Sequence, residues 1–287
     1  ADAPAVPGGA VFAFKRDATG AYAYHSTITS GDANNAGDEF GTSIVAEGPI
    51  VLIGATGRNG RTGVVYEFAV ANEAWVNQRA FAPTGGQAND AFGAHVALAG
   101  SQAVVAAPGD AGGYGAAYVY RRVAQGGRGR AGGGAAQGAA PQAAPASGNF
   151  TWQEVARLTA PAGVRLDRFG TSIAADDKEV WIGAPGASGA GRVFVFAGNQ
   201  ASGFAADAMR LLGAGITAPA AAGTSVSIRG TVAAVGAVTA RNNGGAVYIY
   251  ERDAAGAWVE QPMLTTPIDE IAPITGSERR CTGAGKV

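Results

Sequence analysis

The residues whose types could support recognition lie in Gly-rich segments between short apolar runs. They are Arg58, Asn59, Arg61, Asp110, Tyr114, Arg241, Asn242 and Asn243. Guanidinium, amide, carboxyl and phenol groups on loops held by a rigid scaffold are typical of a binding surface. The same residue types are also ordinary turn formers, so each position taken alone has a structural interpretation as well.

A second group of residues has the composition of a cation site. The segment from Asp32 to Asp38, which includes Asn34, supplies two carboxylates and two amides within seven residues. It lacks the spacing and the closing Glu of an EF-type calcium loop. We therefore expect no metal and no cofactor, with calcium at Asp32, Asn34 and Asp38 as the open alternative.

Signs of catalysis are scarce in this sequence. It has no G-x-S-x-G element, phosphate-binding loop or paired acid and base at a recognisable spacing. Of the two histidines, His95 stands where related segments carry Ser43, Ser172 or Ser225. We expect a protein that is not an enzyme. Trp75, Trp152 and Trp258 could stack on sugar rings, but their repeated position favours a packing role.

Composition excludes several classes of protein. Lys and Arg total 21, Asp and Glu total 22, and the net charge is -1, which argues against a strongly basic nucleic-acid binder. No apolar run is long enough to span a membrane. Cys281 is the single cysteine, so neither a disulfide within the chain nor a multi-cysteine zinc site can form. The small residues of segment 1–5, low charge and scarce cysteine favour a secreted or cell-surface bacterial protein.

An internal repeat organises the chain. A Phe-Gly pair recurs at Phe40, Phe92 and Phe169, with Ala222-Gly223 as a divergent fourth copy. Gly41 and Gly93 are 52 residues apart, and Gly170 and Gly223 are 53 apart. Each copy is followed by a Gly-Ala-Pro-like element, a Gly-led apolar strand and a Trp-led or similar segment. Short strands bounded by Gly, Pro, Asn and Asp at a period near 50 residues predict propeller blades.

The repeat predicts an all-β fold, a propeller of about five four-stranded blades in a single domain spanning 1–287. We expect an N-terminal half blade at 9–30 and full blades at 38–82, 90–160, 167–213 and 222–267. Segment 125–148 consists almost wholly of Gly, Ala, Gln, Pro and Arg, which predicts a flexible insertion. Segment 268–287 is expected to be a tail or the start of a last blade, so the ring is either irregularly closed or part of a longer propeller.

The Phe-Gly and Gly-Ala-Pro elements, thirteen residues apart, resemble the FG-GAP repeat of integrin-alpha-type propellers and are closest to bacterial secreted FG-GAP proteins. Residues 150–196 carry the resemblance most fully, with Phe169-Gly170 leading to Gly183-Ala184-Pro185. The resemblance implies an extracellular or surface propeller used in recognition or assembly. Integrin-type blades often carry a calcium loop between the first and second strands, but these connections are two-residue turns here, so calcium is not carried over.

Three functions follow as hypotheses. The first is a non-enzymatic module that binds a protein partner or assembles with itself at the cell surface, through the loops or through an open sheet edge. The second is a carbohydrate-binding, lectin-like propeller. The third is a polysaccharide-active enzyme on a propeller scaffold. We expect no nucleic-acid partner. The loops differ between repeats, which favours a single partner over a repeated sugar site.

Overall fold

The computed structural model describes residues 7–32, 36–71, 74–124, 150–161, 167–199, 203–212, 216 and 219–265. Within these residues the fold is all-β, as predicted, with one two-stranded and four four-stranded antiparallel sheets. The expected insertion at 125–148 and the segment 268–287 lie outside the described residues. No helix in the described part of the chain is long and apolar enough to cross a membrane.

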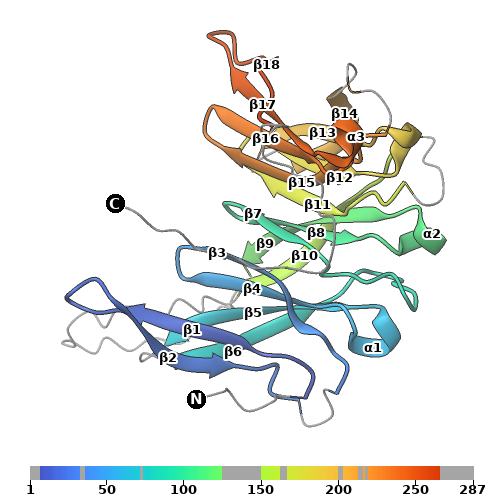
Figure 1. The fold of residues 1–287 in the computed structure, drawn as a ribbon. Helices are drawn as coiled ribbons and strands as arrows, with labels where there is room; N and C mark the ends of the chain where they lie inside the picture. Colours follow the sequence, from blue (N-terminus) through green and yellow to red (C-terminus); the bar gives the residue numbers. More distant parts are fainter. Residues whose placement is uncertain are drawn as a thin grey trace, which may run out of the picture.

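The strands follow the chain order within each sheet (Figure 1). The half blade consists of β1 (Val11–Arg16) and β2 (Tyr22–Ile28). Blade 1 consists of β3 (Phe40–Glu47), β4 (Ile50–Ala55), β5 (Val64–Ala71) and β6 (Ala74–Phe81). Blade 2 consists of β7 (Val96–Ala99), β8 (Gln102–Ala107), β9 (Ala116–Ala124) and β10 (Phe150–Leu158). Blade 3 consists of β11 (Ser172–Ala175), β12 (Glu179–Ala184), β13 (Arg192–Asn199) and β14 (Gly203–Leu212). Blade 4 consists of β15 (Ala222–Arg229), β16 (Val232–Ala237), β17 (Ala246–Arg252) and β18 (Trp258–Glu260).

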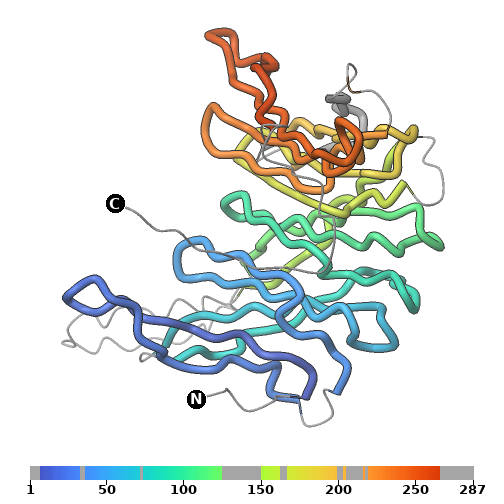
Figure 2. Tube along the Cα trace, in the orientation of Figure 1, coloured from blue at the N-terminus to red at the C-terminus, as the bar shows by residue number. Residues whose placement is uncertain are grey.

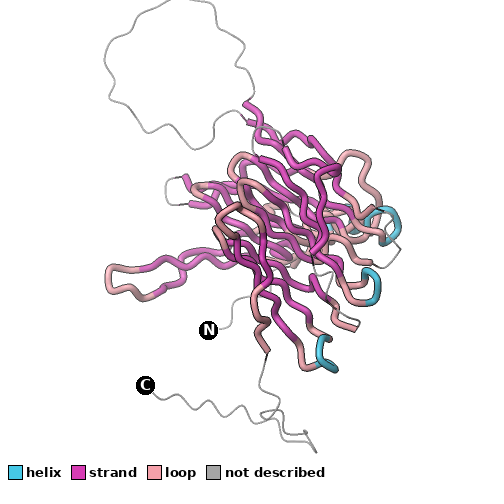
Figure 3. Tube along the Cα trace, turned by 90° about the horizontal axis from the view of Figure 1, so that it is seen from above, coloured by secondary structure: helices cyan, strands magenta, loops and turns pink. Residues whose placement is uncertain are grey.

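The blades are stacked face to face in the order of the sequence. Figures 1 and 2 show the half blade at one end of this stack and blade 4 at the other. Seen from above in Figure 3, the turn of one two-stranded hairpin projects well away from the stacked sheets. Within the described residues, the arrangement is an open arc of propeller blades, and each of the two end sheets has one face that no other described sheet covers.

Packing between blades follows one rule. Alternate side chains of each third strand point to the following blade, because successive residues of a strand face opposite sides of the sheet. Val65 of β5, for example, joins the core cluster of Phe92, Tyr118 and Tyr120 in blade 2. The aromatic residues on the other face of each third strand pack toward the preceding blade. Middle strands are therefore covered on both faces, which explains why β4, β8 and β12 are almost entirely buried.

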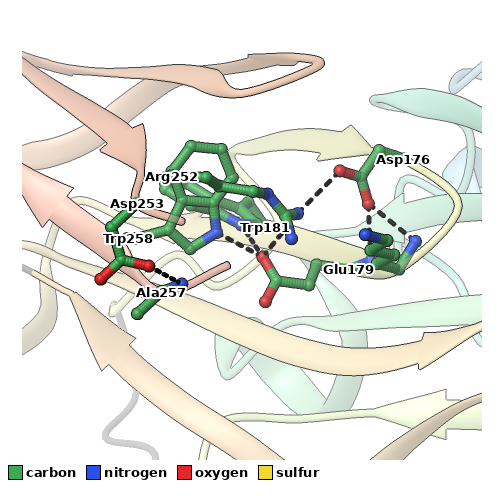
Figure 4. Close-up of polar contacts among 8 residues, drawn as sticks. Asp176, Glu179, Trp181, Arg252, Asp253, Ala257 and Trp258 are labelled. Carbon is green, nitrogen blue, oxygen red and sulfur yellow. Dashed lines mark hydrogen bonds and ion pairs between the residues drawn. The ribbon is translucent and has the colours of Figure 1, made fainter. Parts of the chain in front are cut away.

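A polar cluster also joins blades 3 and 4 near the outer strands (Figure 4). Trp258 Nε1 of β18 donates a hydrogen bond to Glu179 Oε2 at 2.6 Å, and Arg252 Nη2 lies 3.3 Å from the same oxygen. Arg252 also pairs with Asp176 at 2.9 Å, and its guanidinium covers the Trp258 ring at 4.4 Å. The tryptophan of the fourth strand is thus a junction residue here, held by an acid from the preceding blade.

Candidate functional site

The connections between second and third strands all lie on one side of the stack. They form α1 (Arg58–Arg61), α2 (Asp110–Gly113), η1 (Ala187–Gly189) and α3 (Ala240–Asn243). In Figure 1, α1, α2 and α3 lie on the right, and the β3–β4 and β7–β8 turns lie on the left. We call the side that bears these four turns the loop face.

Each turn of the loop face is fastened to the segment that enters its own blade. The backbone N–H of Gly57 donates to Asp38 O at 2.9 Å, and that of Gly109 donates to Asp90 O at 3.0 Å. Gly186 N–H and Asp167 O form the same bond in blade 3 at 3.1 Å. The repeated bond places the turns at equivalent positions along the stack, so backbone contacts with the scaffold hold the loop face in each of these three blades.

Left-handed backbone explains part of the composition of these turns. Asn59 has φ 53°, Arg241 has φ 54°, and Asn242 and Asn243 have φ 56° and 69°. Asparagine enters this region at a lower cost than most residues, since its short side chain can hydrogen-bond locally. The backbone conformation therefore explains why asparagine occupies positions 59, 242 and 243, whether or not these side chains also bind a partner.

Arg58 points inward to the two aspartates of the calcium-like segment. Its guanidinium lies 2.6 Å from Asp38 Oδ2 and 3.1 Å from Asp32 Oδ2. Tyr66 OH donates to Asp32 at 2.9 Å, and burial together with this bond raises the pKa of Tyr66 to about 12. Asn34 lies outside the described residues. Within the residues that the structure describes, no group of three or more His, Cys, Asp or Glu side chains could hold a metal.

Asp110 is a buried member of the predicted surface. Arg157 of β10 binds both of its carboxylate oxygens, at 2.5 and 3.1 Å, and Tyr118 OH donates a further hydrogen bond to it. Burial, followed by the bond to Asp110, raises the pKa of Tyr118 to about 12. With these three hydrogen bonds, the Asp110 carboxylate fastens α2 to strands β9 and β10. Because the side chain is buried, it offers little surface for contact with a partner.

The remaining predicted residues stay accessible. Tyr114 is 44% exposed. The others exposed on the loop face are Asn59, Arg61, Arg241, Asn242 and Asn243. Arg61 contacts Glu39 Oε1 at 2.6 Å, and both side chains remain about half exposed. The loop face thus presents an aromatic ring, two guanidiniums and three amides over α1, α2 and α3.

Sequence reasoning missed a cleft between the half blade and blade 1. It measures about 360 Å³ and is lined by Ala13, Phe14, Lys15, His25, Val70 and Trp75. Trp152, the counterpart of Trp75 in blade 2, donates a hydrogen bond to Glu67, which also contacts Arg122. Around Trp75, Ala13 stands in the position of Glu67 and Val70 stands in the position of Arg122. An alignment of the repeats could have found this cleft, because it places apolar Ala13 and Val70 where blade 2 is lined by an acid and an arginine.

His95 is placed by the repeat and not by a catalytic partner. Its counterparts Ser43 and Ser172 donate through Oγ to Gly93 O at 2.6 Å and Gly223 O at 2.8 Å, across the junction to the next blade. Among the described residues, no carboxylate and no nucleophilic side chain forms a hydrogen bond with the His95 ring. We expect His95→Ser to leave the free energy of unfolding unchanged or to raise it by up to about 1 kcal/mol, by restoring that bond. Urea denaturation followed by circular dichroism measures the change, and a loss above about 1 kcal/mol would contradict it.

The fold and the repeated junctions define a β-propeller architecture. Residues 75–120 and 152–196 match the family model described as the FG-GAP repeat, so the chain contains FG-GAP repeats. No curated protein matches the chain.

Among solved structures, the chain is similar to a candidate 6-phosphogluconolactonase from Bacteroides uniformis, with a TM-score of 0.52 and 15% identity. The match covers 91% of this chain and 64% of that one, so the chain spans less than two thirds of the length of that protein. An identity this low shows a shared fold alone.

Proposed function

We propose that the protein is a non-enzymatic binding module, outside the cell or at its surface, that recognises a protein partner through the loop face. The observation that carries the proposal is the set of six exposed polar and aromatic side chains on turns fastened to the blades. Rigid presentation lowers the entropic cost of binding, and Tyr and Arg are the residue types that dominate binding energy at interfaces.

The side-chain contacts of the loop face separate residues that support the turns from residues that are free to contact a partner. Arg58 and Asp110 are engaged by Asp38 and Arg157, respectively, and so act as supports. Tyr114 and Arg241 are exposed and project from different turns. The FG-GAP repeats are in keeping with an extracellular location, which is part of the proposal.

A cell-binding assay tests the loop face. Labelled protein is added to the cells that produce it, and saturable binding is measured by flow cytometry with and without protease treatment of the cells. The double variant Tyr114→Ser with Arg241→Ser should bind at least about tenfold more weakly, the effect of losing interface anchors. Glu47→Ser with Arg229→Ser changes exposed residues next to the strand turns on the other side and should bind normally. Equal binding by both double variants would contradict the proposal.

The cleft at Trp75 favours carbohydrate binding as a second candidate. An indole face beside Lys15 and His25 offers a stacking surface with polar groups at its edge. A glycan array, run with and without a calcium chelator, tests it. Defined sugar signals that are lost in Trp75→Ala and retained in Tyr114→Ser would support a lectin. An array without signals would leave the protein-binding proposal alone.

A further inference from the structure

The junctions between blades share one docking arrangement at their inner strands. The Phe-Gly segment of each following blade lies against the glycine that opens the third strand of the preceding one. Phe92 N–H donates to Thr62 O at 2.9 Å and pairs with Gly63 as a parallel bridge. Ala222 N–H donates to Ala190 O at 2.9 Å, beside Gly191. Phe40 N–H likewise donates to Gly8 O at 2.7 Å.

A second glycine, in the middle strand, completes this arrangement. A Cβ built on Gly54 would lie 2.0 Å from Gly93 O, and one on Gly183 would lie 2.0 Å from Gly223 O. Real Cβ atoms do not approach an oxygen so closely, so the docked backbone requires glycine at these two positions. The serine of the same blade, Ser43 or Ser172, donates its Oγ hydrogen to that docked carbonyl.

Blade 4 has the same glycine and serine positions on the face that no described blade covers. By the repeat spacing, Gly236 corresponds to Gly54 and Gly183, Gly245 corresponds to Gly63 and Gly191, and Ser225 corresponds to Ser43 and Ser172. These residues line a cleft of about 460 Å³. We call the cleft formed by Ser225, Gly236, Gly244, Gly245, Val247 and Leu264 the blade 4 seat.

No described segment of another blade lies over the blade 4 seat. The three atoms nearest to a Cβ built on Gly236 all belong to Ser225 of the same blade, and a Cβ on Gly245 would have only Val238 O within 4 Å, at 3.8 Å. Val247 is 37% exposed and Leu264 is 60% exposed. At the corresponding position in blade 1, Val65 is fully buried and belongs to the same core cluster as Phe92.

We propose that the blade 4 seat binds a Phe-Gly strand of a second FG-GAP polypeptide. The Phe N–H would donate to Gly244 O, its ring would cover Val247, and the Gly carbonyl would accept from Ser225 Oγ. The junctions of blades 1 and 2 and of blades 3 and 4 define this ligand chemistry, since both show what the same glycine and serine bind. The Phe-Gly and Ala-Gly segments at residues 40, 92, 169 and 222 are already docked at their own junctions, so none of these four supplies the strand. We assign the strand to a second polypeptide as part of the proposal.

This surface adjoins the loop face at α3, where Gly244 follows Asn243, but it uses different residues, and the inference goes beyond the proposed function. It resembles the addition of a peptide strand to an exposed sheet, where backbone hydrogen bonds give affinity and side-chain pockets give selectivity. The selectivity here would lie in the glycine, whose φ of 97° at Gly41 and 90° at Gly93 few other residues adopt.

A labelled peptide with the sequence of residues 38–47 provides the direct test, by fluorescence anisotropy against the full chain. We expect saturable binding. The same peptide with Phe40→Ser or with Gly41→Val should bind at least about tenfold more weakly, since the first loses the buried ring and the second cannot adopt the docked backbone. Equal binding of all three peptides would overturn the proposal.

Variants of the chain locate the binding. Gly236→Val places a side chain in the blade 4 seat and should abolish binding, and Ser225→Ala should weaken it about three- to tenfold by removing one hydrogen bond. Ala23→Val adds the same kind of side chain to an exposed position of β2, in the half blade, and should bind normally. Circular dichroism confirms that each variant is folded, and normal binding by folded Gly236→Val would overturn the assignment.

A variant chain that ends after Thr265 tests whether residues 266–287 occupy the blade 4 seat. If the shortened chain binds the peptide and the full chain does not, residues 266–287 compete for the seat and the proposal of a second polypeptide is wrong. If neither chain binds, the seat does not take a Phe-Gly strand. The cell-binding assay with Tyr114 and Arg241 variants is unaffected by either result, so the two proposals fail independently.

Discussion

Replacing Glu67 with alanine is expected to lower the free energy of unfolding by about 3–5 kcal/mol, the range for breaking a buried ion pair. Glu67 is 0% exposed. Its carboxylate accepts from Trp152 Nε1 at 2.7 Å and contacts Arg122 at 3.1 Å and Arg79 at 3.2 Å. The alanine variant leaves two guanidiniums at the junction of blades 1 and 2 without their shared anion.

Urea denaturation followed by circular dichroism measures this loss. Arg61→Ala is the matched control, since it removes an ion pair whose side chains are about half exposed and should cost about 0–1 kcal/mol. Glu67→Gln retains an acceptor for Trp152 and should fall between the two. Equal losses for Glu67→Ala and Arg61→Ala would show that the buried cluster does not stabilise the junction.

Replacing Phe169 with alanine is the other change with a large expected effect, a loss of about 3–5 kcal/mol. Phe169 is fully buried and packs edge-on against Phe194 and Phe196 at centroid distances of 5.4 and 6.1 Å. The same core cluster contains Val104 and Val119 of blade 2. Loss of the ring would therefore open a cavity between two blades.

Phe14→Ala provides the comparison for this substitution. Phe14 is 59% exposed on the half blade, and substitutions at exposed positions usually change stability by less than about 0.5 kcal/mol. Thermal and urea unfolding of both variants measure the contrast. A loss for Phe169→Ala no larger than that for Phe14→Ala would contradict the assignment of the Phe-Gly ring to the junction core.

The all-β fold and the repeat were predictable from local sequence. Strand alternation, the spacing of Phe-Gly pairs and the turn residues act over short distances, and every blade repeats them. Second-to-third-strand connections recur in the same place in each repeat, and the structure places them on one side of the stack. The proposed surface at Tyr114, Arg241 and Asn242 remains a prediction that awaits the binding assay.

Pairing over long distances was not predictable. Glu67 and Trp152 are 85 residues apart in the chain, and the acid that meets Trp258 is Glu179, which occupies a different strand of its blade. The conversion of Asp32 and Asp38 from a calcium-like pair into partners of Arg58 likewise depends on which turn lies beside them. A carboxylate in sequence shows neither which cation it faces nor how deeply it is buried.

The sequence by itself determined the type of the strands, their order in each blade and the need for glycine at repeated positions. These properties come from backbone conformation and side-chain alternation, which neighbouring residues set. The tertiary structure alone decided which face of which blade remains uncovered, so that Gly54 and Gly183 lie beneath another backbone while Gly236 does not. That difference arises because similar repeats have different neighbours in the middle and at the ends of an open stack.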